Sequence, residues 1–173
     1  MSRLVSIVFG MGLLRPAPGT WASAAALILG MLLLHFAGFA ALVAATVGAT
    51  VLGFWACRAE LVGRPGVDPS EIVIDEVAGQ WLTLLFPAAG FYFAPAAQAA
   101  LQANGGWLPW PAWIVPFLLF RLFDIWKPWV IGRADRRTDP AGVMLDDLWA
   151  GLFAGIATVI LAAAYHIPII LMK

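Results

Sequence analysis

Residues 72–81, IVIDEVAGQW, place two adjacent carboxylates, Asp75 and Glu76, at the start of a long apolar run. No charged residue follows until Arg121. A membrane-spanning helix needs about 20 mostly apolar residues. The stretch therefore predicts a helix that enters a membrane with two acids at its edge.

The composition of the whole chain agrees with a membrane protein. The chain has 173 residues, of which 62% are hydrophobic and only 12% are charged, whereas soluble domains have about 25% charged residues. The net charge is zero, so there is no general basic field that would attract nucleic acid. The single Cys57 excludes an intrachain disulfide framework and a multi-cysteine metal site. We expect one domain over residues 1–173.

Three stretches contain no Asp, Glu, Lys or Arg: residues 16–57, 77–120 and 148–172. The first two are about twice as long as one span requires, so each predicts a helical hairpin, and the third predicts one helix. We expect an all-α, polytopic membrane bundle of about four to five transmembrane helices. The expected helices cover residues 22–34, 39–55, 77–93, 112–126 and 148–170, and residues 94–111 are expected to form an interfacial loop.

The charges predict the orientation of this bundle. Short loops rich in Lys and Arg stay in the cytosol. If the chain starts in the cytosol, five helices place nine of the ten Lys and Arg residues on that side and leave only Lys173 outside. We therefore expect a charged catalytic face at the cytosolic surface. Three arginines in residues 133–142 are expected to meet anionic phospholipid headgroups there.

Two pairs of acids stand at expected helix entrances, Asp75–Glu76 and Asp146–Asp147. Acids are favourable at a helix N-terminus, so simple capping is one explanation of each pair. Capping does not explain why both pairs and Asp124 converge on one membrane face. Clustered carboxylates are typical ligands of Mg²⁺. Because successive helix positions point about 100° apart, we expect one acid of the second pair to face the site and the other to face water or cap the helix.

Residues 117–129, FLLFRLFDIWKPW, carry Arg121, Asp124 and Lys127 at spacings of three, which forms a stripe on one helix face. An intrahelical ladder of ion pairs is the alternative to a functional site. A ladder does not explain Pro128, which is expected to end or kink the helix and turn Lys127 away from its axis. Cations beside a carboxylate cluster suit a phosphate bridged to a metal.

Residues 15–27, RPAPGTWASAAAL, form an expected loop that enters the first helix. Gly19 frees the backbone, and Thr20 or Ser23 can cap the helix. A helix N-terminus binds phosphate, and Arg15 is near, although a plain capped helix explains the pattern equally well. Taken together, the carboxylates, the cations and the single polar face indicate metal-assisted phosphoryl chemistry on a lipid headgroup. The residues alone leave hydrolysis and transfer open.

At these same positions the chain resembles the phosphatidylglycerophosphatase A family. The shared motifs read PGTWAS, IVIDEVAG, FRLFDIWKPWVI and DDLWAG, in the family's order, from about residue 16 to residue 151. The resemblance implies an all-α enzyme that removes the terminal phosphate of phosphatidylglycerophosphate, with Mg²⁺, at the cytosolic face of the bacterial inner membrane. Two departures, Val130 for a second proline and Ala22 for a glycine, affect the geometry of the loops more than the activity.

The resemblance also implies roles for individual residues. Attack by a water on Mg²⁺ is preferred over a phospho-aspartyl intermediate, because no residue is an evident nucleophile. The implied metal ligands are Asp75, Glu76, Asp124, Asp146 and Asp147, which together with Lys127 form the catalytic set, and the implied substrate-binding residues are Arg121, Gly19, Thr20 and Arg15.

Two other classes of protein compete with this interpretation. A CDP-alcohol phosphatidyltransferase is also a multi-span, Mg²⁺-dependent membrane enzyme, but its DG…AR…G…D…D pattern is absent. A small transporter or non-enzymatic membrane subunit is the second alternative. A transporter is expected to place charges near the middle of the bilayer, whereas the charges here gather at one surface.

Overall fold

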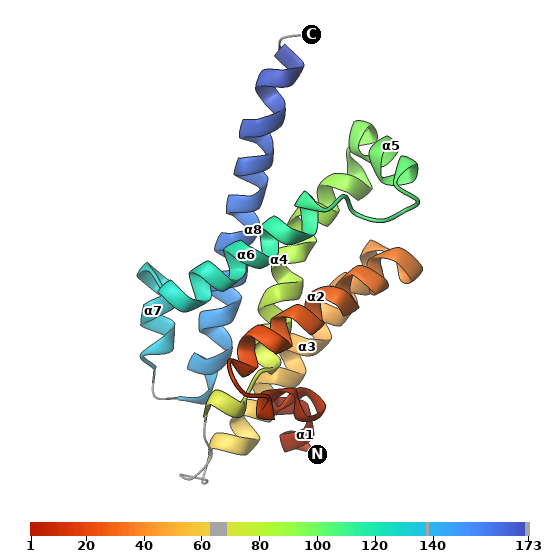
Figure 1. Ribbon diagram of the computed structural model, residues 1–173. Helices are drawn as coiled ribbons and strands as arrows, with labels where there is room; N and C mark the ends of the chain where they lie inside the picture. The colour runs from red at the N-terminus through yellow and green to blue at the C-terminus, as the bar shows by residue number, and fades with distance from the viewer. Residues whose placement is uncertain (63–68, 138, 172–173) are drawn as a thin grey trace.

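The computed structural model describes residues 1–62, 69–137 and 139–171, and in these residues all regular structure is helical (Figure 1). Two short elements, α1 (Ser2–Ser6) and the 3-10 helix η1 (Val8–Leu13), precede the bundle, and a second 3-10 turn, η2 (Pro69–Glu71), precedes its central helix. The remaining helices are α2 (Pro18–Ala37), α3 (Phe39–Leu61), α4 (Ile74–Phe93), α5 (Pro95–Ala103), α6 (Pro111–Trp126), α7 (Trp129–Asp135) and α8 (Pro140–Leu171).

The five expected helices are all present, but most of them begin at an earlier residue than the expected helix ranges gave. Helix α8 begins at Pro140, eight residues before the expected start at residue 148, and α2 begins at Pro18 instead of residue 22. Each starts at a proline, whose fixed φ suits the first turn of a helix. The first helix is therefore full length, with 20 residues, and not the short segment that we expected.

Two short helices replace expected loops. Helix α5 lies within residues 94–111 and bends by 98° from α4, and α7 occupies part of the loop that follows Pro128. Their positions follow prolines, because Pro95 is the first residue of α5 and Pro128 is the N-cap of α7. Apolar pattern alone did not distinguish such short helices from loops.

Helix α4 is the centre of the bundle and packs against α2, α3, α5, α6 and α8. Its contact with α8 is unusually close because Gly79 and Gly151 face each other. A Cβ on Gly79 would lie 2.6 Å from the carbonyl oxygen of Asp147, and a Cβ on Gly151 would lie 2.5 Å from the carbonyl oxygen of Gly79. The hydroxyl of Thr83 donates hydrogen bonds to the carbonyl oxygens of both glycines, at 2.9 and 3.2 Å.

Three helices, α2, α3 and α8, are long and apolar enough to span a membrane, and a fourth span is added if the bent pair α4–α5 counts as one. Helix α6 has 16 residues, fewer than the about 20 that cross a bilayer. The all-α membrane bundle is therefore confirmed, and four spans agree with the lower expected number. The predicted outer position of Lys173 lies outside the described residues, and a single domain stays a prediction.

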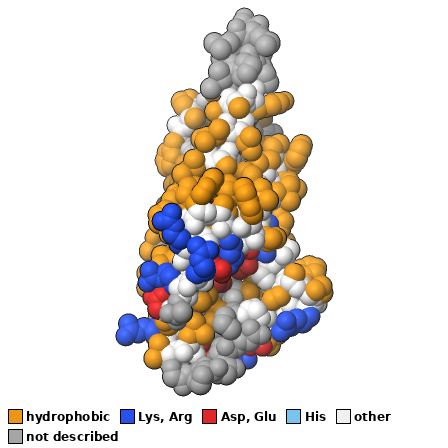
Figure 2. All heavy atoms as spheres, turned by 90° about the vertical axis from the view of Figure 1, so that its left-hand side faces the viewer, with side chains coloured by type: hydrophobic (Ala, Val, Ile, Leu, Met, Phe, Trp, Pro, Cys, Tyr) orange, Lys and Arg blue, Asp and Glu red, His pale blue; other side chains and the backbone are white. Residues whose placement is uncertain are grey.

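The polar and apolar surfaces of the bundle are separated along its length. Figure 2 shows Lys, Arg, Asp and Glu side chains gathered in the lower part of one face, with hydrophobic side chains covering the part above. Inside, an apolar cluster fills the space among α2, α3, α4 and α6 beyond the charged end. We call it the inner apolar cluster, and its buried members are Leu27, Leu34, Leu42, Leu84, Ala88, Leu108 and Ala112.

Candidate active site

A pocket of about 250 Å³ opens at the charged end of the bundle. It is bounded by the first turn of α2, the link from η2 to α4, the end of α6 and the first turns of α8. All of the predicted site residues except Arg15 line it. Its lining consists of Ala17, Pro18, Gly19, Thr20, Ser70, Ile72, Val73, Asp75, Glu76, Arg121, Asp124, Lys127, Asp146 and Asp147.

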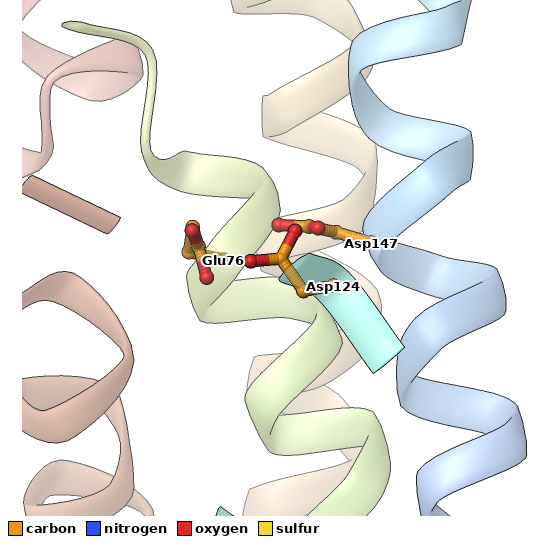
Figure 3. Close-up of side chains that lie close together, drawn as sticks. All are labelled: Glu76, Asp124 and Asp147. Carbon is orange, nitrogen blue, oxygen red and sulfur yellow. The ribbon is translucent and has the colours of Figure 1, made fainter. Parts of the chain in front are cut away.

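Three carboxylates from three helices meet in this pocket (Figure 3). Glu76 comes from α4, Asp124 from α6 and Asp147 from α8, and one oxygen of each lies within 4.8 Å of the others. Their residues are at most 9% exposed. Like charges are brought together in a buried place only where cations or a ligand compensate them. We call these three residues the carboxylate group.

Arg121 supplies one compensating charge. Its Nη1 lies 2.5 Å from a carboxylate oxygen of Glu76 and 3.0 Å from one of Asp124. The second contact is the intrahelical pair that the alternative interpretation of the stripe predicted, but the first links α6 to α4. With all three carboxylates ionised, as metal binding would require, the group and the guanidinium would carry a local charge of −2. A divalent cation would balance that charge.

Lys127 occupies the other side of the pocket. Helix α6 ends at Trp126, and Lys127 follows in the left-handed conformation, with φ 50° and ψ 51°, directly before Pro128. This turn brings the amino group to 2.8 Å from Asp146 and 2.5 Å from Asp135. Partial burial alone lowers the pKa of Lys127, but the hydrogen bonds and attraction from the two carboxylates outweigh it and raise the pKa above its ordinary value. The amino group is therefore charged at neutral pH.

The second acidic pair departs from our expectation. Asp146 and Asp147 are both buried, 7% and 3% exposed, and both line the pocket, so neither faces water. Because α8 begins at Pro140, the pair lies well inside the helix and does not cap it. The residue at the N-cap of α4 is Val73, with no side-chain cap. The capping explanation is therefore wrong for the second pair, whereas Asp75 and Glu76 do lie in the first turn of α4, where the helix dipole favours acids.

The start of α2 contributes Gly19 and Thr20 to the pocket but not Arg15, which is exposed. The predicted caps are wrong, because the N-cap position is Ala17 and no side chain caps this helix. A glycine is needed at position 19 because of close packing and not because of loop freedom. A Cβ at Gly19 would collide with the carboxylate of Glu76. The glycine lets α2 approach α4 at the site.

The roles of three further residues in or beside the pocket were not predicted from the sequence. The hydroxyl of Ser23 donates a hydrogen bond of 2.6 Å to Glu76, and Nη1 of Arg121 lies 3.2 Å from the same hydroxyl. Ser70 lines the pocket, and Asp135 holds Lys127. Ser23 lies on a helix four residues after Gly19, a spacing that marks a shared face. That spacing was the only available signal.

The carboxylate group could hold a metal ion. Its three oxygens lie within 4.8 Å of one another, and carboxylate oxygens are ligands that hard divalent cations prefer. Asp75 and Asp146 line the same pocket without belonging to this group, and their role as ligands stays a prediction. The residues that could hold the metal in this arrangement are Glu76, Asp124 and Asp147.

The fold and the site define a helical membrane enzyme with a buried acidic centre and two cations at one end of its bundle. The chain belongs to the phosphatidylglycerophosphatase A family, whose sequence model matches residues 4–162. This membership makes it a phosphatase and decides against the phosphatidyltransferase and transporter alternatives.

Individual relatives cover most of the chain. A Haemophilus influenzae protein named phosphatidylglycerophosphatase A is 34% identical over 152 residues, which is 87% of this chain and 82% of the relative. An Escherichia coli protein of the same name is 29% identical over 167 residues, 96% of this chain and 85% of the relative. A Bacteroides thetaiotaomicron protein, named as a proposed phosphatidylinositol-3-phosphatase, is 34% identical over 155 residues, 87% of each. No solved structure matches the chain.

Proposed function

We propose that the protein hydrolyses the terminal phosphate monoester of phosphatidylglycerophosphate to give phosphatidylglycerol, in a Mg²⁺-dependent step of phospholipid biosynthesis. The observation that carries the proposal is the carboxylate group, which shares one pocket with Arg121 and Lys127. The names of the Haemophilus influenzae and Escherichia coli relatives support the choice of lipid.

The residues of the chain divide the work between the two sides of the pocket. On one side the carboxylate group holds the metal, and Arg121 and Ser23 orient Glu76. On the other side Lys127 attracts the phosphate. Gly19 and Thr20 lie in the first turn of α2, where the positive end of the helix dipole favours an anion.

Bound Mg²⁺ would neutralise phosphate charge and activate the attacking water. We infer direct attack by water, since among the described residues that line the pocket there is no histidine or cysteine. His35, the histidine of α2, lies in the last turn of that helix, stacked on Trp107. We expect water to enter the pocket from the charged end of the bundle, because Lys, Arg, Asp and Glu side chains gather in the lower part of the face in Figure 2.

We place the protein in the bacterial inner membrane as a multi-pass protein with the pocket on the cytosolic side. Among the residues that the structure describes, the pocket and its charges lie at one end of the bundle, and this supports the orientation because Lys and Arg remain in the cytosol. The substrate would then be taken from the inner leaflet, and the phosphate would be released into the cytosol.

The test is phosphate release from phosphatidylglycerophosphate in detergent micelles, with Mg²⁺ and with EDTA. Wild type is expected to release phosphate only with Mg²⁺, and Asp124→Asn, which removes a member of the carboxylate group, is expected to lose the activity. Asp139→Asn is the matched control, because Asp139 is exposed and pairs with Arg137 outside the pocket. Release that is unaffected by EDTA, or full activity of Asp124→Asn, would contradict the proposal.

The name of the Bacteroides relative favours phosphatidylinositol 3-phosphate as a second candidate substrate. Both lipids carry a phosphate monoester on a polyol headgroup. The same assay with equal mole fractions of the two lipids separates them, and the larger kcat/KM identifies the substrate.

A further inference from the structure

Gln80 is a buried amide without a hydrogen-bond partner. It is 0% exposed, and neither its nitrogen nor its oxygen is paired within the part of the chain that the structure describes. Nε of Arg121 is likewise buried and unpaired. Buried polar groups are nearly always hydrogen-bonded, and each unpaired one is costly. Arg121 lines the pocket, and Gln80 lies outside that lining, one turn of α4 beyond Glu76. We take the two unpaired groups together as pointing to a polar ligand.

The position of Gln80 is set by its neighbours on α4. It follows Glu76 by four residues and precedes Leu84 by four, so the three form one ridge of the helix. Glu76 contacts Ser23 of α2 and Arg121 of α6. Leu84 belongs to the inner apolar cluster, which draws on the same two helices. Gln80 thus lies between the acidic pocket and the inner apolar cluster, on the side of α4 that faces α2 and α6.

The direction of helical side chains supports a link to the pocket. Side chains of an α-helix lean toward its N-terminus. The amide of Gln80 therefore leans toward the turn that carries Glu76, and four residues correspond to about 6 Å along the helix. A group attached to a phosphate bound beside Glu76 is within this reach.

We propose that Gln80, together with Nε of Arg121, binds a free hydroxyl of the substrate headgroup on the carbon next to the one that bears the scissile phosphate. The inference rests on the proposed function. A hydroxyl both donates and accepts, so it can donate to the Gln80 oxygen and accept from Nε of Arg121. A phosphodiester oxygen only accepts and would leave the Gln80 oxygen unpaired.

The same chemistry joins the two candidate lipids. The glycerol of phosphatidylglycerophosphate has its free hydroxyl on the carbon beside the phosphomonoester, and the inositol of phosphatidylinositol 3-phosphate also has hydroxyls on the adjacent carbons. In phosphatidic acid the corresponding oxygen is acylated. Gln80 would therefore be a specificity-determining residue that selects polyol headgroups over diacylglycerol phosphate.

The experiment compares phosphatidylglycerophosphate with an analogue in which propane-1,3-diol replaces the headgroup glycerol, so that the two lipids differ only in this hydroxyl. Wild type is expected to show a kcat/KM about tenfold higher for the parent lipid. Gln80→Met, which keeps the length of the side chain without its amide, is expected to lower this preference, and the contact with Nε of Arg121 is expected to keep part of it.

Thr83→Val is the matched control, because Thr83 is a buried polar residue of α4 whose hydroxyl bonds toward α8. It is expected to keep the wild-type preference. If Gln80→Met folds poorly, Gln80→Asn, which retracts the amide by one carbon, is expected to lower the preference. A wild-type enzyme that hydrolyses both lipids equally, or a Gln80 variant that keeps the full wild-type preference, overturns this inference alone. A wild type that hydrolyses neither lipid overturns the proposed function as well.

Discussion

The two acidic pairs have the same local arrangement but different partners. In each pair the first carboxylate accepts a hydrogen bond from the next backbone amide, at 2.9 Å for Asp75 and 3.0 Å for Asp146. In the α4 pair it is the second acid, Glu76, that meets a cation, Arg121. In the α8 pair it is the first acid, Asp146, that meets Lys127.

This difference shows that the position of an acid within its pair does not determine which acid meets a cation, although the second acid of each pair, Glu76 or Asp147, belongs to the carboxylate group. Arg121 lies within α6, whereas Lys127 follows the end of that helix and folds back toward α8. The two cations therefore approach the pocket from two sides. Arg121 forms an ion pair with Glu76, and Lys127 forms one with Asp146. Asp147, for which no ion pair is seen among the residues that the structure describes, also belongs to the carboxylate group.

The largest effect is expected from Asp147→Asn. Removing a member of the carboxylate group would take away a charge that would hold the proposed metal. A bound metal can stabilise a transition state by several kcal/mol, so kcat is expected to fall about 1,000-fold or more. Phosphate release at saturating Mg²⁺ measures the loss. A loss that high Mg²⁺ fully restores would show weakened metal binding, and an unchanged kcat would remove Asp147 from the site.

A smaller effect is expected from Asp146→Asn, within the same pair. This carboxylate positions Lys127 and does not belong to the carboxylate group. Residues that orient a functional group typically contribute about 10- to 100-fold. The measurement is kcat/KM beside that of Asp147→Asn. Equal losses for the two variants would make Asp146 a metal ligand too, and the distinction between the members of the pair would fail.

Gly79→Ala tests the close packing of α4 against α8, which keeps the two acidic pairs near each other. The added methyl group would collide with the Asp147 carbonyl and with Phe120, and overpacking of this kind costs about 1–3 kcal/mol. We expect a lower thermal unfolding midpoint in detergent and lower activity. Gly90→Ala, in the same helix with open space around it, is the control and is expected to be neutral or slightly stabilising. Equal behaviour of the two variants would mean that α4 and α8 are not closely packed.

The smallest effect is expected from Asp135→Asn, which removes the outer partner of Lys127. The Asp135 side chain is 46% exposed, and exposed ion pairs contribute about 0–1 kcal/mol. Activity is therefore expected to fall less than about fivefold. Loss of this partner lowers the pKa of Lys127 toward its ordinary value of 10.5, so the amino group stays charged and the pH–rate profile keeps its shape between pH 6 and about 9. A new loss of rate within that range would contradict this account.

Charge-free stretches predicted the helices well, because a membrane span is a local property of composition. They predicted where the helices begin less well. Pro140 starts α8 eight residues before the charge-free stretch that begins at residue 148, so the acids of α8 came to lie inside the helix. Because the helix begins earlier than expected, Asp146 and Asp147 line the pocket and neither caps the helix.

The members of the site could be predicted from the motifs, but not their partners. Glu71 lies four residues before Asp75, yet the chain forms a 3-10 turn there and Glu71 bonds to Arg3. The contact of Ser23 with Glu76 and the isolation of Gln80 depend on how α2 and α6 pack against α4. Such contacts join residues far apart in the sequence, and a single sequence does not show which of those residues meet.

The facing glycines at positions 79 and 151 have an evolutionary consequence. A crowded contact between two helices can usually drift, because a larger residue on one side is accommodated by a smaller residue on the other. Here both sides already have the smallest residue, and each helix backbone touches the other. No compensating substitution exists, so neither position can change first without moving the acids of one pair away from those of the other.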